Sequence, residues 1–183
     1  MREMAFAKSA SHDVIASEQK LADLVRQIQA AGRVALDTEA DSLHSYREKL
    51  CLVQISVPSA VHSVCDFIVD PLSNLDLQPL RYAFESREIV LHAADYDLRM
   101  LRRGLNFTAS KIFDTVVAAR LLGIREFSLG ALVKRFFDVE LYKHSQKANW
   151  ALRPLPRRML EYAVDDVHYL LPLAAQLEEE LED

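Results

Sequence analysis

The sequence predicts an α/β fold in which a mixed β-sheet is flanked by α-helices. Short apolar runs of strand length are confined to the first half of the 183-residue chain. Segments with apolar residues at helical spacing precede, separate and follow these runs. The resulting order is a helix, three strands, a helix, a fourth strand and then several helices, which is typical of a sheet covered by helices.

The expected strands are bounded by residues that favour turns. They span residues 33–37, 50–57, 60–67 and 88–92. Gly32 separates the first strand from the helix before it. The second and third strands are separated only by Pro58 and Ser59, which predicts an antiparallel hairpin. If the first and fourth strands are neighbours, the carboxylates at their ends lie at one edge of the sheet.

The expected helices follow from apolar residues that recur every three or four positions. They span residues 17–31, 73–84, 95–103, 114–122, 128–137 and 157–182. Gly104 and Gly123 are expected to end two of them, and Ser128 is expected to cap the start of another.

The charge distribution leaves nucleic-acid binding open. The formal net charge is −5, but an acidic tail at residues 178–183 contains five of the negative charges. Without this tail the remaining charges cancel. Residues 141–160 contain no carboxylate and combine lysines and arginines with aromatic residues. This basic stretch can therefore meet a phosphate backbone or form a solvated surface loop.

The composition is that of a single globular domain, which we expect to span residues 1–183. No apolar run reaches the roughly 20 residues of a membrane helix, and the first residues lack the apolar stretch of a secretory signal. We therefore expect a cytoplasmic protein without a membrane partner. Cys51 and Cys65 are then expected as reduced thiols, while a disulfide between them stays open.

A first pair of carboxylates stands at the end of the first strand. Asp37 and Glu39 are two residues apart, so in a strand their side chains lie on the same face. Two buried carboxylates repel each other unless a cation or a proton compensates them, and their hard oxygen atoms suit Mg²⁺ or Mn²⁺. An exposed turn is the alternative for this short pattern.

Two further clusters contain acidic residues. His92 and Asp97 lie where the fourth strand gives way to a helix, and Asp95 between them is expected to cap that helix. Tyr162 and Asp166 are four residues apart, so they share one face of an apolar helix. A carboxylate on that face needs a partner such as a metal ion, and a phenol one turn away can orient a water molecule. A structural Tyr–Asp contact in the core is the alternative.

Together the clusters give the order Asp, Glu, Asp, Asp, with a tyrosine four residues before the last acid. This pattern resembles the DEDDy class of the DEDD exonuclease superfamily, and the surrounding sequence is similar to ribonuclease D over residues 12–177. The similar segments are VALDTE (34–39), LVQIS (52–56), HAADYDL (92–98), FDT (113–115), AARLLG (118–123), Trp150, RPL (153–155) and YAVDDVHYLL (162–171).

The resemblance implies a ribonuclease-H-like mixed β-sheet flanked by α-helices and a metal-dependent 3′-5′ exonuclease. It implies Asp37, Glu39, Asp97 and Asp166 as ligands of two divalent metal ions, Mg²⁺ or Mn²⁺, and Tyr162 as the residue that positions the nucleophilic water. The expected partner is the 3′ end of single-stranded RNA, or of DNA, and the expected products are nucleoside 5′-monophosphates. Bacterial ribonuclease D carries further helical nucleic-acid-binding domains after this region, so substrate preference stays open.

Five further residues are candidates for substrate binding. Gln54 and His92 are expected to contact the terminal nucleotide or the leaving group. Lys147, Trp150 and Arg153 belong to the basic stretch and are expected to guide the strand by charge and stacking. A noncatalytic RNA-binding or scaffolding module with the same fold is the alternative function. A serine hydrolase is disfavoured because the sequence lacks a Gly-x-Ser-x-Gly elbow.

Overall fold

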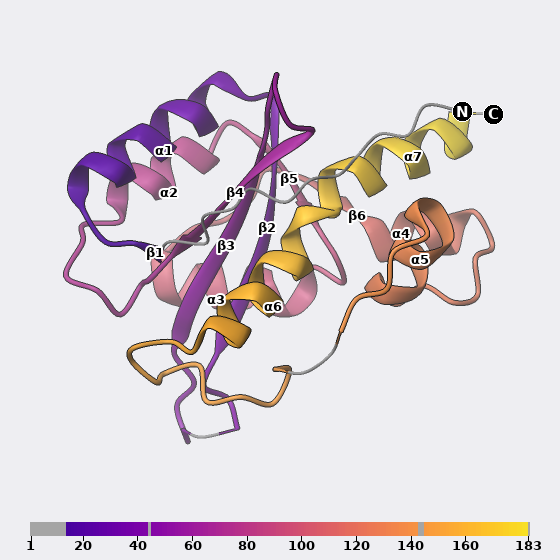
Figure 1. Ribbon diagram of the computed structural model, residues 1–183. Helices are drawn as coiled ribbons and strands as arrows, with labels where there is room; N and C mark the ends of the chain where they lie inside the picture. The colour runs from indigo at the N-terminus through magenta and orange to yellow at the C-terminus, as the bar shows by residue number, and fades with distance from the viewer. Residues whose placement is uncertain (1–13, 44, 143–144, 183) are drawn as a thin grey trace.

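The computed structural model describes residues 14–43, 45–142 and 145–182, which form one mixed sheet with helices on both faces (Figure 1). The strands are β1 (Val14–Ile15), β2 (Arg33–Ala40), β3 (Leu50–Pro58), β4 (Val64–Val69), β5 (Glu88–Leu91) and β6 (Lys111–Asp114). The helices are α1 (Glu18–Ala30), α2 (Gln78–Phe84), α3 (Asp95–Leu105), α4 (Thr115–Leu121), α5 (Leu129–Phe137), α6 (Arg157–His168) and α7 (Leu170–Glu182). The predicted α/β class is confirmed.

The strand order places the candidate acidic residues at one edge of the sheet. The order is β1-β4-β3-β2-β5-β6, with β2 antiparallel to β3 and parallel to β5. The predicted hairpin is also present, because β3 and β4 are antiparallel neighbours. Ala35 pairs with Val90, so the C-terminal half of β2 extends past the end of β5. The carboxylates of β2 therefore lie close to the segment that follows β5.

The two faces of the sheet have different covers. Helices α1, α2 and α3 lie against one face, and α6 and α7 run diagonally across the other (Figure 1). Leu24 and Ile28 of α1 are fully buried against the first face, as their helical spacing predicts. Helices α4 and α5 lie beside α7. None of the described helices is both long enough and apolar enough to cross a bilayer.

Several element boundaries differ from the predicted ones. Strand β4 begins four residues late because the Ser59 hydroxyl accepts hydrogen bonds from the backbone N–H groups of Val61 and His62 and so widens the turn. Helix α2 begins at Gln78, close to Pro79, which suits the first turn of a helix. Strands β1 and β6 were not predicted, because each is short and half of β6 is exposed.

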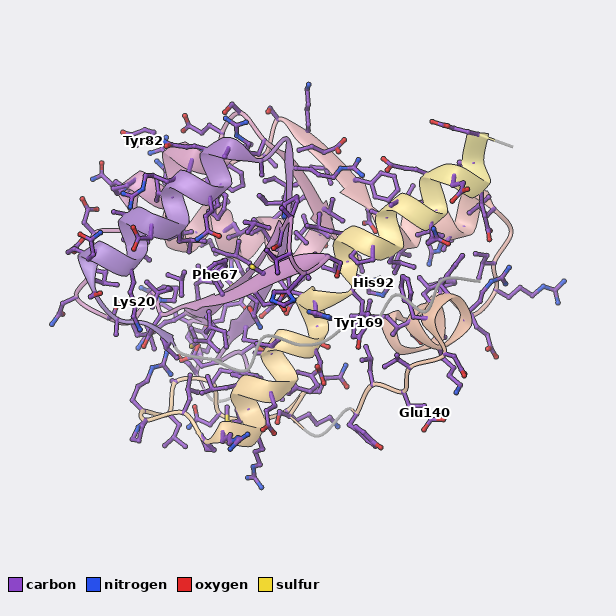
Figure 2. The ribbon with its side chains drawn as sticks, turned by 45° about the horizontal axis from the view of Figure 1, so that its top comes forward. Lys20, Phe67, Tyr82, His92, Glu140 and Tyr169 are labelled. Atoms are coloured by element: carbon purple, nitrogen blue, oxygen red, sulfur yellow. The ribbon has the colours of Figure 1, made fainter. Side chains whose placement is uncertain are left out.

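The predicted helix over residues 157–182 is divided in two at Tyr169 (labelled in Figure 2). Pro172 explains the break, since it has no N–H to donate to the carbonyl of His168. The described part of the expected acidic tail is the last turn and a half of α7, with Glu178 paired to Arg33. The described part of the acidic segment is therefore helical, as the predicted helix over residues 157–182 implies.

Candidate active site

Three carboxylates from two elements meet at the edge of the sheet. Asp37 and Glu39 alternate with Thr38 along β2, so they point to the face that α6 covers. Asp166 of α6 reaches the same point from above the sheet. One oxygen atom from each of Asp37, Glu39 and Asp166 lies within 4.8 Å of the others. Such a set of hard oxygen donors can hold a divalent cation.

Asp97 reaches this edge from the first turn of α3. Its Oδ1 accepts hydrogen bonds from the Thr38 backbone N–H at 3.0 Å and from the Thr38 hydroxyl at 2.6 Å. The carboxylate is buried and borders the same cavity as the other three acids. It is not one of the three whose oxygen atoms converge within 4.8 Å. Thr38, which the sequence did not single out, thus holds Asp97 beside the acidic cluster.

The electrostatics of the site favour a bound cation. Burial, followed by repulsion from Asp166 and Asp97, raises the pKa of Glu39 to about 9. The same two causes hold the pKa of Asp37 well above its ordinary value, and burial raises that of Asp97 to about 6. Without a cation these groups must hold protons or repel each other. A divalent cation would compensate their charges directly.

Tyr162 lies one helical turn before Asp166 and borders the cavity. Its hydroxyl is hydrogen-bonded to Asp166, and burial raises the pKa of the phenol above its ordinary value. The phenol therefore stays protonated at neutral pH, and it can orient a water molecule but cannot act as a base. The sequence prediction that Tyr162 and Asp166 share one face is confirmed.

His92 follows β5 directly and is oriented by a chain of hydrogen bonds (His92 is labelled in Figure 2). The Thr115 hydroxyl donates to the Leu91 carbonyl at 3.2 Å, so it must accept from His92 Nδ1–H at 2.8 Å. Burial lowers the pKa of His92 to about 4, which keeps the ring neutral. His92 borders the cavity, and its Nε2 is then a hydrogen-bond acceptor.

Asp114 holds the loop between β5 and α3. Its carboxylate accepts hydrogen bonds from the backbone N–H groups of Ala93 and Ala94, and it also caps α4. Ala93 has a φ of 58°, a strained left-handed conformation for alanine. Asp95, the expected cap of α3, lies inside the helix and pairs with Arg99 instead. Asp114, expected as the first residue of the helix over residues 114–122, therefore also anchors this loop.

The acidic cluster opens into a cavity of about 490 Å³. Polar and apolar side chains from five segments surround it. Its lining residues are Asp37, Thr38, Glu39, Ala40, Ser42, Leu43, His92, Ala93, Tyr96, Asp97, Ser128, Leu129, Gly130, Leu141, Tyr142, Gln146, Ala148, Tyr162 and Asp166. The cavity therefore combines the acids with the phenol, an imidazole and exposed apolar groups.

Two of the expected substrate-binding residues lie in the core. Gln54 is fully buried in β3 opposite Asp37 and does not border the cavity, because helices cover both faces of this central strand. Trp150 is only 1% exposed, and its ring lies 6.1 Å from that of Tyr162. These two predictions are wrong: neither side chain is accessible to a nucleotide, and Trp150 supports Tyr162 from behind.

The two basic candidates differ in their surroundings. The Arg153 guanidinium makes a two-point contact with Asp70 at 2.7 Å and also donates to the carbonyl of Cys51. It anchors the loop before α6 to the sheet and is not placed to meet a phosphate, so that prediction is also wrong. Lys147 is exposed, and both of its neighbours in the chain border the cavity. Lys143 and His144 of the basic stretch lie outside the described residues.

Comparison with known proteins connects this geometry to a family. The chain matches the family described as 3′-5′ exonuclease over residues 13–182. It is 36% identical over 171 residues to exosome complex component 10 of Rattus norvegicus, covering 92% of this chain and 19% of the rat protein. The match with the rat protein therefore spans about a fifth of that protein's length.

Solved structures with the same fold support this family assignment. One of them is the crystal structure of Escherichia coli RNase D, which is described as an exoribonuclease involved in structured RNA processing. It matches this chain with a TM-score of 0.83 and 30% sequence identity, and the match covers 94% of this chain and 45% of that one. Brucella melitensis NrnC bound to pGG has a TM-score of 0.71 and 28% identity, covering 83% of this chain and 74% of that one. The chain therefore belongs to the 3′-5′ exonuclease family, as an exonuclease domain of the ribonuclease D type.

Proposed function

We propose that the protein hydrolyses the terminal phosphodiester at the 3′ end of single-stranded RNA in a metal-dependent reaction and releases nucleoside 5′-monophosphates. The observation that carries the proposal is the convergence of oxygen atoms from Asp37, Glu39 and Asp166 within 4.8 Å, in an open cavity beside Tyr162. The family assignment supports cleavage that begins at the 3′ end of the strand. The description of the E. coli enzyme as an exoribonuclease supports RNA as the substrate.

The donor set suits divalent metal ions, and Mg²⁺ or Mn²⁺ are the ions we propose. Asp37, Glu39 and Asp166 would hold one ion, and Asp97 beside them supplies the further carboxylate that a second ion needs. When bound, such ions supply Lewis acidity that activates a water molecule and stabilises the charge on the leaving oxygen. The raised pKa values of the acids mean that metal binding must release protons.

The remaining groups orient the substrate and the water. The Tyr162 phenol, held by Asp166, orients the attacking water towards the phosphate. His92 Nε2 accepts a hydrogen bond from a hydroxyl of the terminal ribose, since Thr115 fixes the ring so that this nitrogen is an acceptor. Lys147 meets a phosphate further along the strand. The exposed Leu43 and Tyr142 on the rim offer apolar surface to the bases.

Digestion of end-labelled oligomers tests the proposal. A 5′-labelled RNA should shorten from its 3′ end with Mg²⁺ or Mn²⁺ and stay intact with EDTA. A 3′-terminal phosphate should slow the reaction, and a DNA oligomer of the same sequence measures the preference for RNA. Internal cleavage, or cleavage from the 5′ end, would contradict the proposal. Tight RNA binding without any cleavage in either metal would favour the noncatalytic binding module instead.

A further inference from the structure

A buried polar cluster lies on the opposite side of α6 from the acidic cluster. His168 at the end of α6 donates its Nδ1–H to Asp66 Oδ2 of β4 at 2.6 Å, and the two side chains are only 2% and 3% exposed. The Ser56 hydroxyl of β3 donates to the other oxygen of Asp66. Both carboxylate oxygens therefore have a donor, and we call Ser56, Asp66 and His168 the tether.

The side chains of His168 and Asp166 project from opposite sides of α6. In the sheet β3 lies between β4 and β2, and α6 crosses all three strands. His168 reaches β4, whereas Asp166 reaches Asp37 and Glu39 of β2. Two residues correspond to about 200° around a helix axis, so these contacts oppose each other across the helix. A rotation of α6 that breaks one contact displaces the other.

Stability alone does not account for the tether. A buried hydrogen-bonded polar cluster usually adds little to stability compared with apolar side chains of similar shape, because desolvation of its polar groups offsets the gain from the hydrogen bonds. The surrounding contacts of this end of α6 are apolar and include Val64, Val167 and Leu170. Meanwhile one oxygen atom of Asp166 is held within 4.8 Å of oxygen atoms of Asp37 and Glu39, where ionised carboxylates repel each other unless a cation compensates them. A helix held only by apolar contacts can rotate to relieve this repulsion, whereas a directional hydrogen bond resists such a rotation.

We propose that Asp66 and His168 are positioning residues that fix the rotation of α6 and so hold Asp166 and Tyr162 at the metal site. The inference rests on the proposed metal-dependent hydrolysis. It predicts that the tether acts on metal affinity and turnover, and that it contributes little to stability.

An apolar replacement of the tether separates positioning from stability. The variant S56A/D66V/H168L removes every polar group of the tether. Three quantities are measured: the unfolding midpoint in EDTA, the affinity for Mn²⁺ by calorimetry, and kcat and KM on a short RNA. We expect an unfolding midpoint at or above that of the wild type, Mn²⁺ affinity about tenfold weaker, kcat at least about tenfold lower and KM unchanged. Wild-type Mn²⁺ affinity and kcat in this folded variant would overturn the inference.

A second pair of variants keeps the test valid if the triple variant does not fold. His168→Asn places an amide N–H near the position of Nδ1, so this variant should keep Mn²⁺ affinity and kcat close to those of the wild type. His168→Phe has no such donor, so its Mn²⁺ affinity and kcat should fall as in the triple variant. Equal Mn²⁺ affinity and equal kcat in the two variants would overturn the inference.

Leu177→Ala in α7 is the matched control, since it opens a cavity in the core away from the site and should lower stability without changing Mn²⁺ affinity. A wild-type protein that neither binds Mn²⁺ nor cleaves RNA would instead overturn the proposed function.

Discussion

Single side chains in this site are oriented by neighbours that constrain their chemistry. Tyr162 lies between Asp166, which accepts its hydroxyl proton in a hydrogen bond, and Trp150, which packs behind its ring. His92 is oriented by Thr115, which accepts from its Nδ1–H. In both cases the protein fixes a polar atom of the side chain, and the residue borders the cavity. The roles proposed for these residues rest on that arrangement.

Removal of the Tyr162 hydroxyl tests its proposed catalytic role. Tyr162→Phe keeps the ring and its packing against Trp150, so we expect the protein to fold normally. Turnover should fall roughly 10²-fold because the water is no longer oriented, while KM and Mn²⁺ affinity change little. Steady-state kinetics with a metal titration measure all three. A rise in KM alone would mean that the hydroxyl binds substrate and does not orient water.

Substitution of His92 tests whether Nε2 accepts from the terminal ribose. His92→Phe removes the acceptor, so KM for RNA should rise roughly three- to tenfold, the value of one hydrogen bond. An RNA that ends in a 2′,3′-dideoxynucleotide lacks the donor, and on this substrate the two proteins should have the same KM. His92→Gln offers an amide oxygen and serves as the control. An equal rise in KM on both substrates would assign His92 a packing role only.

The elements that carry the acids are held by close contacts and by backbone anchors. Helix α3 presents Asp97, and Gly104 near its end brings the helix against β3. A Cβ atom at Gly104 would lie 2.6 Å from Leu50 Cδ2 and 2.7 Å from Leu50 Cβ. Gly104 was expected to end this helix. It lies inside α3, and Asn106, with a φ of 51°, ends it instead.

Gly104→Ala tests this close approach. The added methyl group should force α3 away from β3 and lower the free energy of unfolding by about 1–3 kcal/mol. Gly130→Ala is the control, because a Cβ there meets nothing within 4 Å and alanine favours the helix by about 0.5–1 kcal/mol. Denaturant unfolding of both variants gives the comparison. A Gly104→Ala protein as stable as the wild type would show that α3 can shift freely.

At the scale of the whole molecule, the acidic cluster makes the free energy of unfolding depend on pH and on metal binding. The pKa of Glu39 is raised to about 9 and that of Asp97 to about 6, so the folded protein without metal holds protons that the unfolded chain releases above roughly pH 4.5. An acid whose pKa is raised by folding contributes stability at low pH, and this contribution is lost as the pH rises through the raised pKa. The molecule without metal is therefore destabilised at high pH.

Unfolding at several pH values tests this linkage. In EDTA the free energy of unfolding should fall between about pH 5 and pH 9, and the fall should be smaller in Glu39→Gln, which cannot ionise. Mg²⁺ or Mn²⁺ should reduce the dependence in the wild type, because the ion replaces the protons. The dependence would have another origin if the wild type and Glu39→Gln showed the same slope in EDTA.

The sequence predicts the acidic residues better than it predicts their surroundings. Their spacing in a strand and in a helix is local, so it indicates correctly which side chains share a face. Burial is not local: Arg153 has its partner Asp70 83 positions away, and its charge alone does not distinguish an anchor from a phosphate contact. Gln54 was misplaced for a similar reason, because a polar side chain in a strand does not reveal that helices cover both faces.

The measurement that tests the central claim most directly is a single-turnover assay on RNA labelled in its last nucleotide. With Mg²⁺ the wild type should release the label as a nucleoside 5′-monophosphate. Asp37→Asn and Asp166→Asn, which keep the size of the side chain but remove its charge, should be folded and slower by orders of magnitude. Near wild-type release by either folded variant, or release that persists in EDTA, would contradict the account of a metal-dependent 3′-5′ exonuclease.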